Sequence, residues 1–441
     1  MQYLELHNVE YGECIVLGGK CKDIFMVDCG SINQKIREGD VDFSEYIVQN
    51  IARRYHTAPD RRFLLTHFHR DHLCGLNQIL HYDPHYFSRI YLPYSPQDRR
   101  GNPLLLEFAL FVYVFLSRQT NYSQMNVSAL KIFDRMASVT GCDCIYTLKA
   151  DDTFSFDGIT YDVLWPQQEE YPFNEMFSSI VEDLNVCLSS PFLGSQAGEF
   201  LQLKERFGQE YLACCKAFRE QNRAPLPVRE QAVANLTSIM EQIDAIIPEL
   251  NLLPTVPDIV EILNRPVTRT AYSEAVNAAS IIFHNHRSSE ASYDDILMTG
   301  DATPDSMDAI GDRLYDGYYL IKAPHHGTAS GWSHWFNEIS AAHILISNGD
   351  YHAGGDIAEE YVNMQAIKHC TNNSACRWFT STGCSCNRLA CCYEQYPKPG
   401  LTIKCPAVAR QSKFAGCNIY IIMPGGERAC LCDNLPTVIN N

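Results

Sequence analysis

Three histidines and one aspartate fall within six residues of a single short segment, which reads His-Phe-His-Arg-Asp-His from His67 to His72. The segment follows the apolar run Phe63–Leu65, so we expect a tight turn at the end of a strand. Imidazole and carboxylate groups are ligands that suit zinc, manganese or iron. We therefore predict a metal site with two adjacent positions. The ligands of one position are His67 and His69, and those of the other are Asp71 and His72.

Two later apolar strands also end in ligand-type residues. The first ends in Thr299-Gly300-Asp301, and the second ends in Pro324-His325-His326-Gly327. A polar residue at the end of a buried strand is held rigidly, so Asp301 and His325 are expected to complete the site. A carboxylate at Asp301 could bridge two ions about 3.5 to 4 Å apart.

Composition limits the partners of the chain. Its 441 residues are 46% hydrophobic, which is ample for a large core in one elaborated domain or in two. Its formal charge of -17 would repel a nucleic-acid duplex, because affinity for phosphates comes mainly from lysine and arginine. We therefore expect no binding of long DNA. A phosphorylated small molecule or a single-stranded nucleic acid held at metal ions stays compatible with this charge.

The compartment is predicted from what the sequence lacks. The first residues show no basic segment followed by an apolar core, so we expect no signal peptide. The longest apolar stretch, from Leu104 to Leu116, is shorter than the roughly 20 residues that span a bilayer, so we expect a buried helix and no membrane insertion. Without a secretory signal, the 19 cysteines indicate reduced thiols in the cytoplasm.

Strand-like and helix-like segments alternate at both ends of the chain. The expected strands are Tyr3–Val9, Cys14–Leu17, Ile24–Val27, Phe63–Leu65, Arg89–Pro93, Thr160–Trp165, Asn277–Phe283, Asp295–Asp301 and Tyr319–Gly327. Two more, Arg377–Thr380 and Asn418–Met423, are expected to finish the second sheet. The expected helices are Phe43–Tyr55, Leu73–Leu80 and Leu104–Arg118.

Between these ends lies a stretch with helical periodicity. From Glu175 to about Thr270 the apolar residues recur at helical spacing, and prolines mark the boundaries of the helices. We interpret residues 171–271 as a helical insertion that could cap the active site or bind a partner protein. Residues 1–170 and 272–441 would then be the two halves of the main fold.

The motifs, taken in order, resemble the metallo-β-lactamase-fold hydrolases. These proteins carry an aspartate after an early strand, an HxHxDH loop, an aspartate often written TGD and a final histidine. The matching positions here are Asp28, His67–His72, Thr299–Asp301 and His325. The chain is most similar to the hydrolase domain of ComEC-type competence proteins. That likeness rests on Tyr11-Gly12-Glu13-Cys14, Asn277 with Ser280, Leu297-Met298-Thr299-Gly300-Asp301, Lys322-Ala323-Pro324-His325-His326-Gly327-Thr328 and Ile346–Gly349 with His352.

The resemblance implies a fold and a set of ligands. The fold is α/β (α+β), a four-layer αβ/βα sandwich, here with a helical insertion. The resemblance implies that Asp28 orients the loop and that Asp301 lies between the two ions. The ligands of the ions are His67 and His69 for the first, and Asp71, His72 and His325 for the second.

One histidine of the family pattern has no clear counterpart. Many members place a third ligand of the first ion before the TGD strand, where Asn277 stands here. His284 and His286 could substitute, although they follow the strand and are more typical of surface or hairpin residues. Two divalent ions are expected, either two tightly held zinc ions or one firm ion and one labile ion such as manganese.

The predicted activity is hydrolysis of a phosphodiester in a nucleotide or nucleic acid by a metal-activated hydroxide. Asp71 is expected to be catalytic as well as a ligand, and His326 or His352 to protonate the leaving group. Two alternatives stay open. One is hydrolysis of a thioester, lactone or amide, because the ligands set the nucleophile and the pocket sets the substrate. The other is a non-catalytic partner subunit. Free-standing relatives occur beside other genes, including those of bacterial defence systems, so the hydrolase could be a component of such a system and could have a partner protein.

A cysteine-rich segment lies near the end of the sequence. Ten cysteines stand between Cys370 and Cys432. Their clustering could form a structural zinc site. Their spacings are not those of zinc ribbons or knuckles, so free thiols are the alternative.

Overall fold

The computed structural model of the chain describes residues 1–36, 41–116, 129–189, 193, 195–287, 295–349, 357–371, 418–423 and 431–433. The chain divides into two compact units. Unit 1 consists of Met1–Ile90, Thr153–Trp165 and Ser280–Asn441, and unit 2 consists of Tyr91–Asp152 and Pro166–Ala279. Unit 2 thus contains all of the predicted insertion 171–271 together with an earlier segment.

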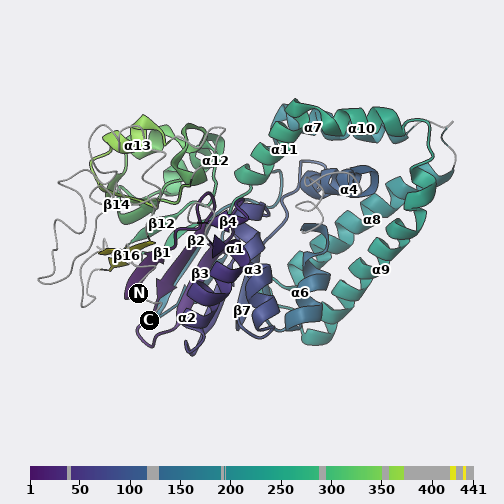
Figure 1. Ribbon diagram of the computed structural model, residues 1–441. Coiled ribbons are helices and arrows are strands. Elements are labelled where there is room, and N and C mark those ends of the chain that lie inside the picture. The colour runs from purple at the N-terminus through teal and green to yellow at the C-terminus, as the bar shows by residue number, and fades with distance from the viewer. Residues whose placement is uncertain are drawn as a thin grey trace, which may run out of the picture. The chain divides into compact units, whose positions relative to one another are not determined.

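The strands of the first sheet that unit 1 contributes have the order β17-β16-β1-β2-β3-β6-β7 (Figure 1). Its strands are β1 (Tyr3–Leu6), β2 (Cys14–Gly18), β3 (Ile24–Cys29), β6 (Arg61–Leu64), β7 (Arg89–Pro93), β16 (Asn418–Ile422) and β17 (Leu431–Asp433). Strands β3 and β6 are parallel, whereas β1, β2 and β3 pair antiparallel. Every residue of β2 and β3 is buried, which explains why uninterrupted apolar runs mark these strands.

The second sheet has the order β15-β14-β13-β12-β11-β10-β9. Its strands are β9 (Thr153–Phe156), β10 (Ile159–Trp165), β11 (Ile282–Asn285), β12 (Ile296–Met298), β13 (Gly317–Lys322), β14 (Ser340–Ile346) and β15 (Ile367–Cys370). Strands β12 to β15 are parallel, and β9 to β12 pair antiparallel. Two mixed sheets with helices confirm the coarse prediction of an α+β fold.

The two sheets of unit 1 meet through aromatic side chains. Phe25 of β3 stacks on Phe154 and Phe156 of β9, with ring centroids 5.3 and 5.6 Å apart. Such pairs add to the stability that burial of apolar surface provides. A short separate sheet is formed by β4 (Lys35–Ile36) and β5 (Val41–Asp42).

The helices of unit 1 include a long stretch that the sequence predicts. The range Phe43–Tyr55 is helical throughout, as α1 (Phe43–Tyr46), η1 (Ile47–Ala52) and α2 (Arg53–Tyr55). Asp42 caps it by accepting a hydrogen bond from the backbone nitrogen of Ser44. The others are α3 (Arg70–Tyr82), α12 (Pro304–Ala309), η3 (Gly311–Arg313), η4 (His325–Gly327), η5 (Ala329–Gly331), η6 (His334–Asn337) and α13 (Glu359–Asn363).

Helix α3 connects the fold to the predicted site. It packs against β3 through a buried face that includes Leu76 and Ile79 (Figure 1). The sequence predicts a helix over Leu73–Leu80, but α3 begins earlier, at Arg70. Asp71 and His72 therefore lie in its first turn, which holds both side chains on a rigid element.

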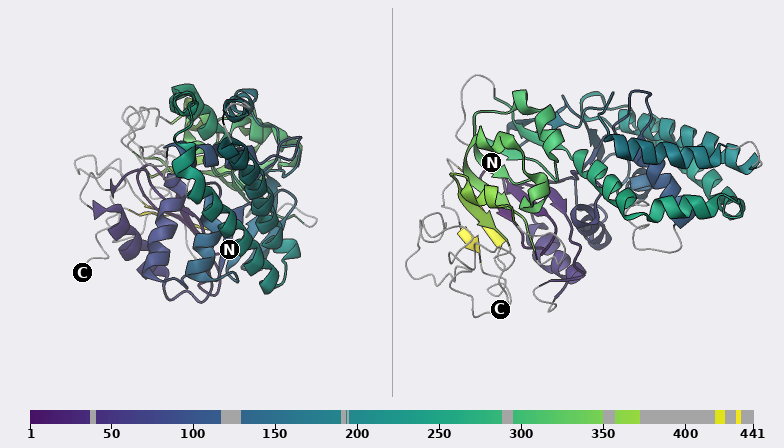
Figure 2. Two further views of the ribbon diagram at one scale, coloured as in Figure 1. Left: turned by 90° about the vertical axis from the view of Figure 1, so that its right-hand side faces the viewer. Right: turned by 90° about the horizontal axis from the view of Figure 1, so that it is seen from above.

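Unit 2 is almost entirely helical. Its elements are α4 (Leu104–Leu116), α6 (Ile132–Thr140), β8 (Ile145–Leu148), α7 (Glu175–Leu188), α8 (Ser195–Ala217), η2 (Glu220–Asn222), α9 (Leu226–Leu250), α10 (Val256–Asn264) and α11 (Pro266–Ala278). The long helices α8 and α9 lie side by side (Figure 2). Helix α4 packs against α7, α8, α9, α10 and α11, so its nearly unbroken apolar sequence is buried as predicted.

Several predicted strands differ from the structure. The expected strands Tyr3–Val9, Asp295–Asp301 and Tyr319–Gly327 end earlier, at Leu6, Met298 and Lys322, so the last residues of each lie in the loop that follows. The expected strand Asn277–Phe283 begins only at Ile282, because α11 continues to Ala278. The expected strand Asn418–Met423 forms β16, but β16 pairs with β1 of the first sheet and does not finish the second. The expected strand Arg377–Thr380 lies outside the described residues. In the described part of the chain, every helix is too short or too polar to cross a lipid bilayer.

Candidate metal centre

Three loops of unit 1 bring the candidate ligands together. The first follows β6 and carries His67, the second follows β12 and carries Asp301, and the third follows β13 and carries His326. Parallel strands end at one edge of a sheet, and this topology collects the polar residues that follow them. Tight turns shape two of these loops, since Gly300 and His326 have φ angles of 52° and 56°.

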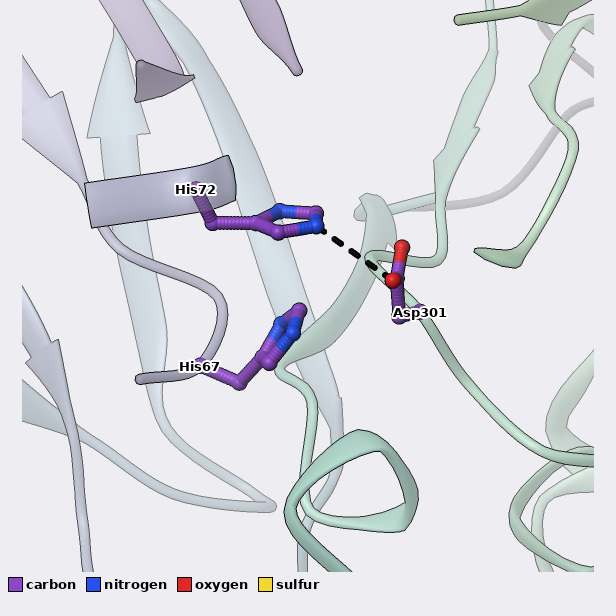
Figure 3. A group of neighbouring side chains, drawn as sticks. All are labelled: His67, His72 and Asp301. Atoms are coloured by element: carbon purple, nitrogen blue, oxygen red, sulfur yellow. Dashed lines mark ion pairs between the residues drawn. The ribbon is translucent and has the colours of Figure 1, made fainter. Parts of the chain in front are cut away.

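His67, His72 and Asp301 form the first group of donors. One donor atom of each lies within 4.8 Å of the others, and all three residues are buried. The Nε2 atom of His72 is 3.3 Å from the Oδ2 atom of Asp301. In Figure 3 the two imidazole rings and the carboxylate point toward one another.

Two further groups adjoin the first. Asp71, His72 and His326 form one of them, and Glu13, Asp301 and His326 form the other. The Nε2 atom of His326 lies 3.2 Å from Oδ2 of Asp71 and 3.4 Å from Oδ2 of Asp301. Because His72 and Asp301 each belong to two groups, the donors could serve two neighbouring ions.

His69 lies close to these donors but outside the three groups. Its ring centroid is 4.8 Å from that of His67, in an edge-on arrangement. Burial lowers the pKa of His69, and the nearby carboxylates of Asp71 and Asp301 oppose that lowering. The rings of His67 and His69, which are predicted to bind one ion together, are therefore neighbours. The donor group that contains His67, however, includes His72 and not His69.

The structure distinguishes the two adjacent histidines after β13. His325, the predicted ligand, is outside the three donor groups, and its Nδ1 atom lies 2.7 Å from the Oγ atom of Ser330. His326, which the sequence suggests as a proton donor, is fully buried among the donors. Its Nδ1 atom donates to the backbone oxygen of Ser347 at 3.0 Å, which leaves Nε2 for the site. The geometry thus favours His326 over His325 as the ligand.

His352, the other suggested proton donor, lies outside the described residues, as does most of the cysteine-rich segment 370–432. Cys370 is described and is buried. His284 is also buried, but its Nδ1 atom lies 2.9 Å from the hydroxyl of Tyr318, and it belongs to none of the three groups.

Asp28 holds the loop and one ligand in place. Its carboxylate accepts hydrogen bonds from the backbone nitrogen and the hydroxyl of Thr66, at 2.8 and 2.7 Å. The Nδ1 atom of His72 lies 2.7 Å from the same carboxylate. A proton on Nδ1 of His72 leaves its Nε2 atom for a metal, which is the usual arrangement of a ligating histidine. These contacts correspond to the orienting role that the family resemblance implies.

The donor set fits a divalent metal ion. The Nε2 atom of His67 is buried, and no described residue hydrogen-bonds to it. Its Nδ1 atom lies 3.0 Å from the hydroxyl of Thr66 and 3.2 Å from that of Ser280, so the ring is fixed with Nε2 toward the cluster. Buried polar atoms rarely go without a partner. An unpartnered imidazole nitrogen beside carboxylates suits zinc or manganese.

Charges in the site follow from burial and from the close contacts. Burial lowers the pKa of His67 well below its ordinary value, and the imidazoles of His72 and His69 lower it further. Burial also lowers the pKa of His69, to about 4. Burial opposes the charge on His326, but the carboxylates of Asp301 and Asp71 together outweigh burial through their charges and hydrogen bonds, and they raise the pKa of His326 to about 9. A protonated His326 balances the negative charge of the same carboxylates that metal ions could bind.

A buried ion pair lies beside the donors, and it is not among the predictions from the sequence. The Nζ atom of Lys322 lies 2.6 Å from Oε2 of Glu13, and both side chains are 1% exposed. Burial lowers the pKa of Lys322, but the charges of Glu13 and Asp301 raise it above its ordinary value. One signal in the sequence could have indicated this pair. Lys322 stands at the end of the apolar strand β13, and a buried ammonium group requires an acidic partner.

Glycines bring the backbones around the site into close contact. A Cβ atom on Gly12 would lie 2.2 Å from the backbone oxygen of Gly30, and one on Gly30 would lie 2.4 Å from the carbonyl carbon of Asp71. The backbone nitrogen of Glu13 donates to the backbone oxygen of Asp71 at 2.9 Å. Only glycine fits such approaches, so these residues set the position of Asp71.

Comparison with known proteins gives no family for this chain. The sequence matches no family model and no curated protein. The resemblance to the metallo-β-lactamase-fold hydrolases therefore stays a prediction that rests on the motifs. The evidence for a metal site is the geometry of the donor groups.

Proposed function

We propose that the protein is a metal-dependent hydrolase of the metallo-β-lactamase fold that acts on a phosphodiester in a nucleotide or nucleic acid. One observation carries the proposal. Five side chains place their donor atoms in overlapping groups, and the atoms of each group lie within 4.8 Å of one another. The first and the last of these residues, His67 and His326, are 259 positions apart in the chain, and the others are Asp71, His72 and Asp301. Structural stability alone does not require such a cluster, because buried charges are costly unless they are paired or bind metal.

The side chains have distinct parts in this proposal. His67, His72, Asp71, Asp301 and His326 would hold one or two divalent ions. Such ions lower the pKa of water to about 7 and neutralise phosphate oxygens, so hydroxide is available at neutral pH. Asp28 keeps a proton on Nδ1 of His72. The buried positions of the ligands exclude bulk water, which strengthens every electrostatic interaction in the site.

A phosphodiester is the proposed substrate class because of the motif order, which is most similar to that of ComEC-type hydrolase domains. The charge of -17 favours a short or single-stranded substrate that is held at the ions. The proposal concerns the chemistry of unit 1 and assigns no partner to unit 2.

The test is an assay of purified protein loaded with Mn²⁺ or Zn²⁺. Single-stranded DNA, a cyclic dinucleotide and a chromogenic phosphodiester are offered to the wild type, to the double variant Asp71→Ala/His72→Ala and to His81→Ala, whose side chain is exposed. We expect the wild type and His81→Ala to turn over at least one substrate and the double variant to turn over none. Absence of turnover by the wild type would exclude the phosphodiesterase activity, and equal turnover by the double variant would exclude the site.

A further inference from the structure

The ion pair between Glu13 and Lys322 touches the donor cluster directly. Besides Glu13, the ammonium of Lys322 contacts the backbone oxygen of Gly300 at 2.7 Å and lies 3.5 Å from Oδ1 of Asp301. Lys322 stands at the end of β13, and Glu13 stands just before β2. Elements from both sheets therefore enclose one buried positive charge and one buried negative charge next to Asp301.

The two oxygens of Asp301 face different partners. Oδ1 is the atom near Lys322, whereas Oδ2 lies 3.3 Å from His72 and 3.4 Å from His326. The ammonium thus orients the carboxylate with one oxygen toward the imidazole ligands. It also places a fixed positive charge beside the position that a divalent ion would share with these ligands.

Stability does not explain why such a pair is present. Taking both charges out of water is costly, and replacing a buried pair by apolar side chains is often neutral or stabilising. Next to a metal site the pair has an electrostatic consequence, because interactions between charges are strong where water is excluded. The ammonium repels an incoming cation, and the Glu13 carboxylate attracts it.

We propose that the Glu13–Lys322 ion pair sets the affinity of the centre for divalent metal ions, with Lys322 weakening and Glu13 strengthening the binding. This inference rests on the metal site of the proposed function, but it does not depend on the substrate. Its signature is a pair of opposite effects. Removing the ammonium strengthens metal binding, removing the carboxylate charge weakens it, and removing both returns the affinity toward that of the wild type.

The test measures Mn²⁺ binding by titration calorimetry and by the electron paramagnetic resonance signal of free Mn²⁺. The variants are Lys322→Met, which keeps the unbranched chain, Glu13→Gln, which keeps the shape, and the double variant. We expect about 10- to 100-fold tighter binding by Lys322→Met and about 10- to 100-fold weaker binding by Glu13→Gln, the range typical for groups that contact metal ligands. The double variant is expected to fall between them, near the wild type.

A purely structural role gives a different result, because both single variants would then weaken binding. Weaker binding by Lys322→Met, or unchanged binding by Glu13→Gln, would overturn the inference. If Lys322→Met does not fold, the comparison of Glu13→Gln with the double variant decides, since adding Lys322→Met must restore the lost affinity. A wild type that binds Mn²⁺ but cleaves no phosphodiester would overturn the proposed function and leave this inference intact.

Discussion

The Nε2 atom of His326 lies 3.2 Å from the Oδ2 atom of Asp71, although 255 positions separate the two residues in the chain. The contact joins the loop after β13 to the first turn of α3. Both residues also belong to the donor group that includes His72. It is the contact that most clearly separates His326 from its neighbour His325.

The first prediction therefore compares the two histidines. His326→Ala is expected to lower Mn²⁺ affinity by more than the 10- to 100-fold typical of groups outside the metal shell, because it removes a donor. His325→Ala, one position earlier, is expected to lower the affinity far less. Calorimetric titration of both variants measures this. A larger loss in His325→Ala would show that the ligand is His325 after all.

The second prediction concerns Asp28. Asp28→Asn keeps the size of the side chain but removes the charge that faces Nδ1 of His72 and the loop at Thr66. We expect a loss of metal affinity of about 10- to 100-fold with the fold retained. Asp312→Asn, at an exposed position, is the matched control. Equal metal affinity in Asp28→Asn and the wild type would refute the orienting role.

The third prediction tests the close packing of the backbone. Gly30→Ala places a Cβ atom 2.4 Å from the carbonyl carbon of Asp71, so the backbone must shift. We expect a loss in the free energy of unfolding of about 1 to 3 kcal/mol, together with weaker metal binding. In contrast, Gly198→Ala in α8 meets nothing within 4 Å and should stabilise its helix by about 0.5 to 1 kcal/mol. Urea denaturation distinguishes these outcomes, and a tolerated Gly30→Ala would contradict the packing argument.

The fourth prediction is a pH dependence of stability. Burial, followed by the nearby charges of Arg313 and Arg287, lowers the pKa of His284 from 6.5 to about 3. The unfolded chain then binds this proton more readily than the folded protein does. The stabilising contribution of the neutral ring is present above pH 6.5 and is lost as the pH falls toward the folded pKa, by up to about 1.4 kcal/mol per pH unit.

His284→Asn retains a hydrogen-bonding group for Tyr318 but removes the titration. The free energy of unfolding, measured from pH 7 to pH 5, should therefore fall less steeply in His284→Asn than in the wild type. His81→Asn, which changes an exposed histidine, should keep the slope of the wild type. The argument fails if His284→Asn and the wild type show the same slope.

Several elements could be predicted from the sequence because their signals are local. The apolar runs of β2 and β3 mark buried strands, and the buried half of β6 is marked by Phe63 and Leu64. The closely spaced histidines and aspartate from His67 to His72 mark a site. The position of Asp301 follows from its place after the strand β12. These signals need only the residues that are adjacent in the chain.

Other features depend on contacts between distant segments. The backbone turns at both His325 and His326, with φ angles of 46° and 56°, so the alternation of a strand does not tell which ring faces the site. The pairing of β16 with β1 joins the two ends of the chain, and no periodicity indicates it. The partnership of Glu13 with Lys322 is likewise visible only when two distant loops are placed together.

The most direct test of the metal centre is anomalous X-ray diffraction at the absorption edge of manganese or zinc, from crystals equilibrated with that metal. We predict one or two peaks about 2.0 to 2.2 Å from donor atoms of His72, Asp301 and His326, with His67 or Asp71 as a further ligand. Absence of any peak among these side chains, at a metal concentration that saturates binding in solution, would contradict the account.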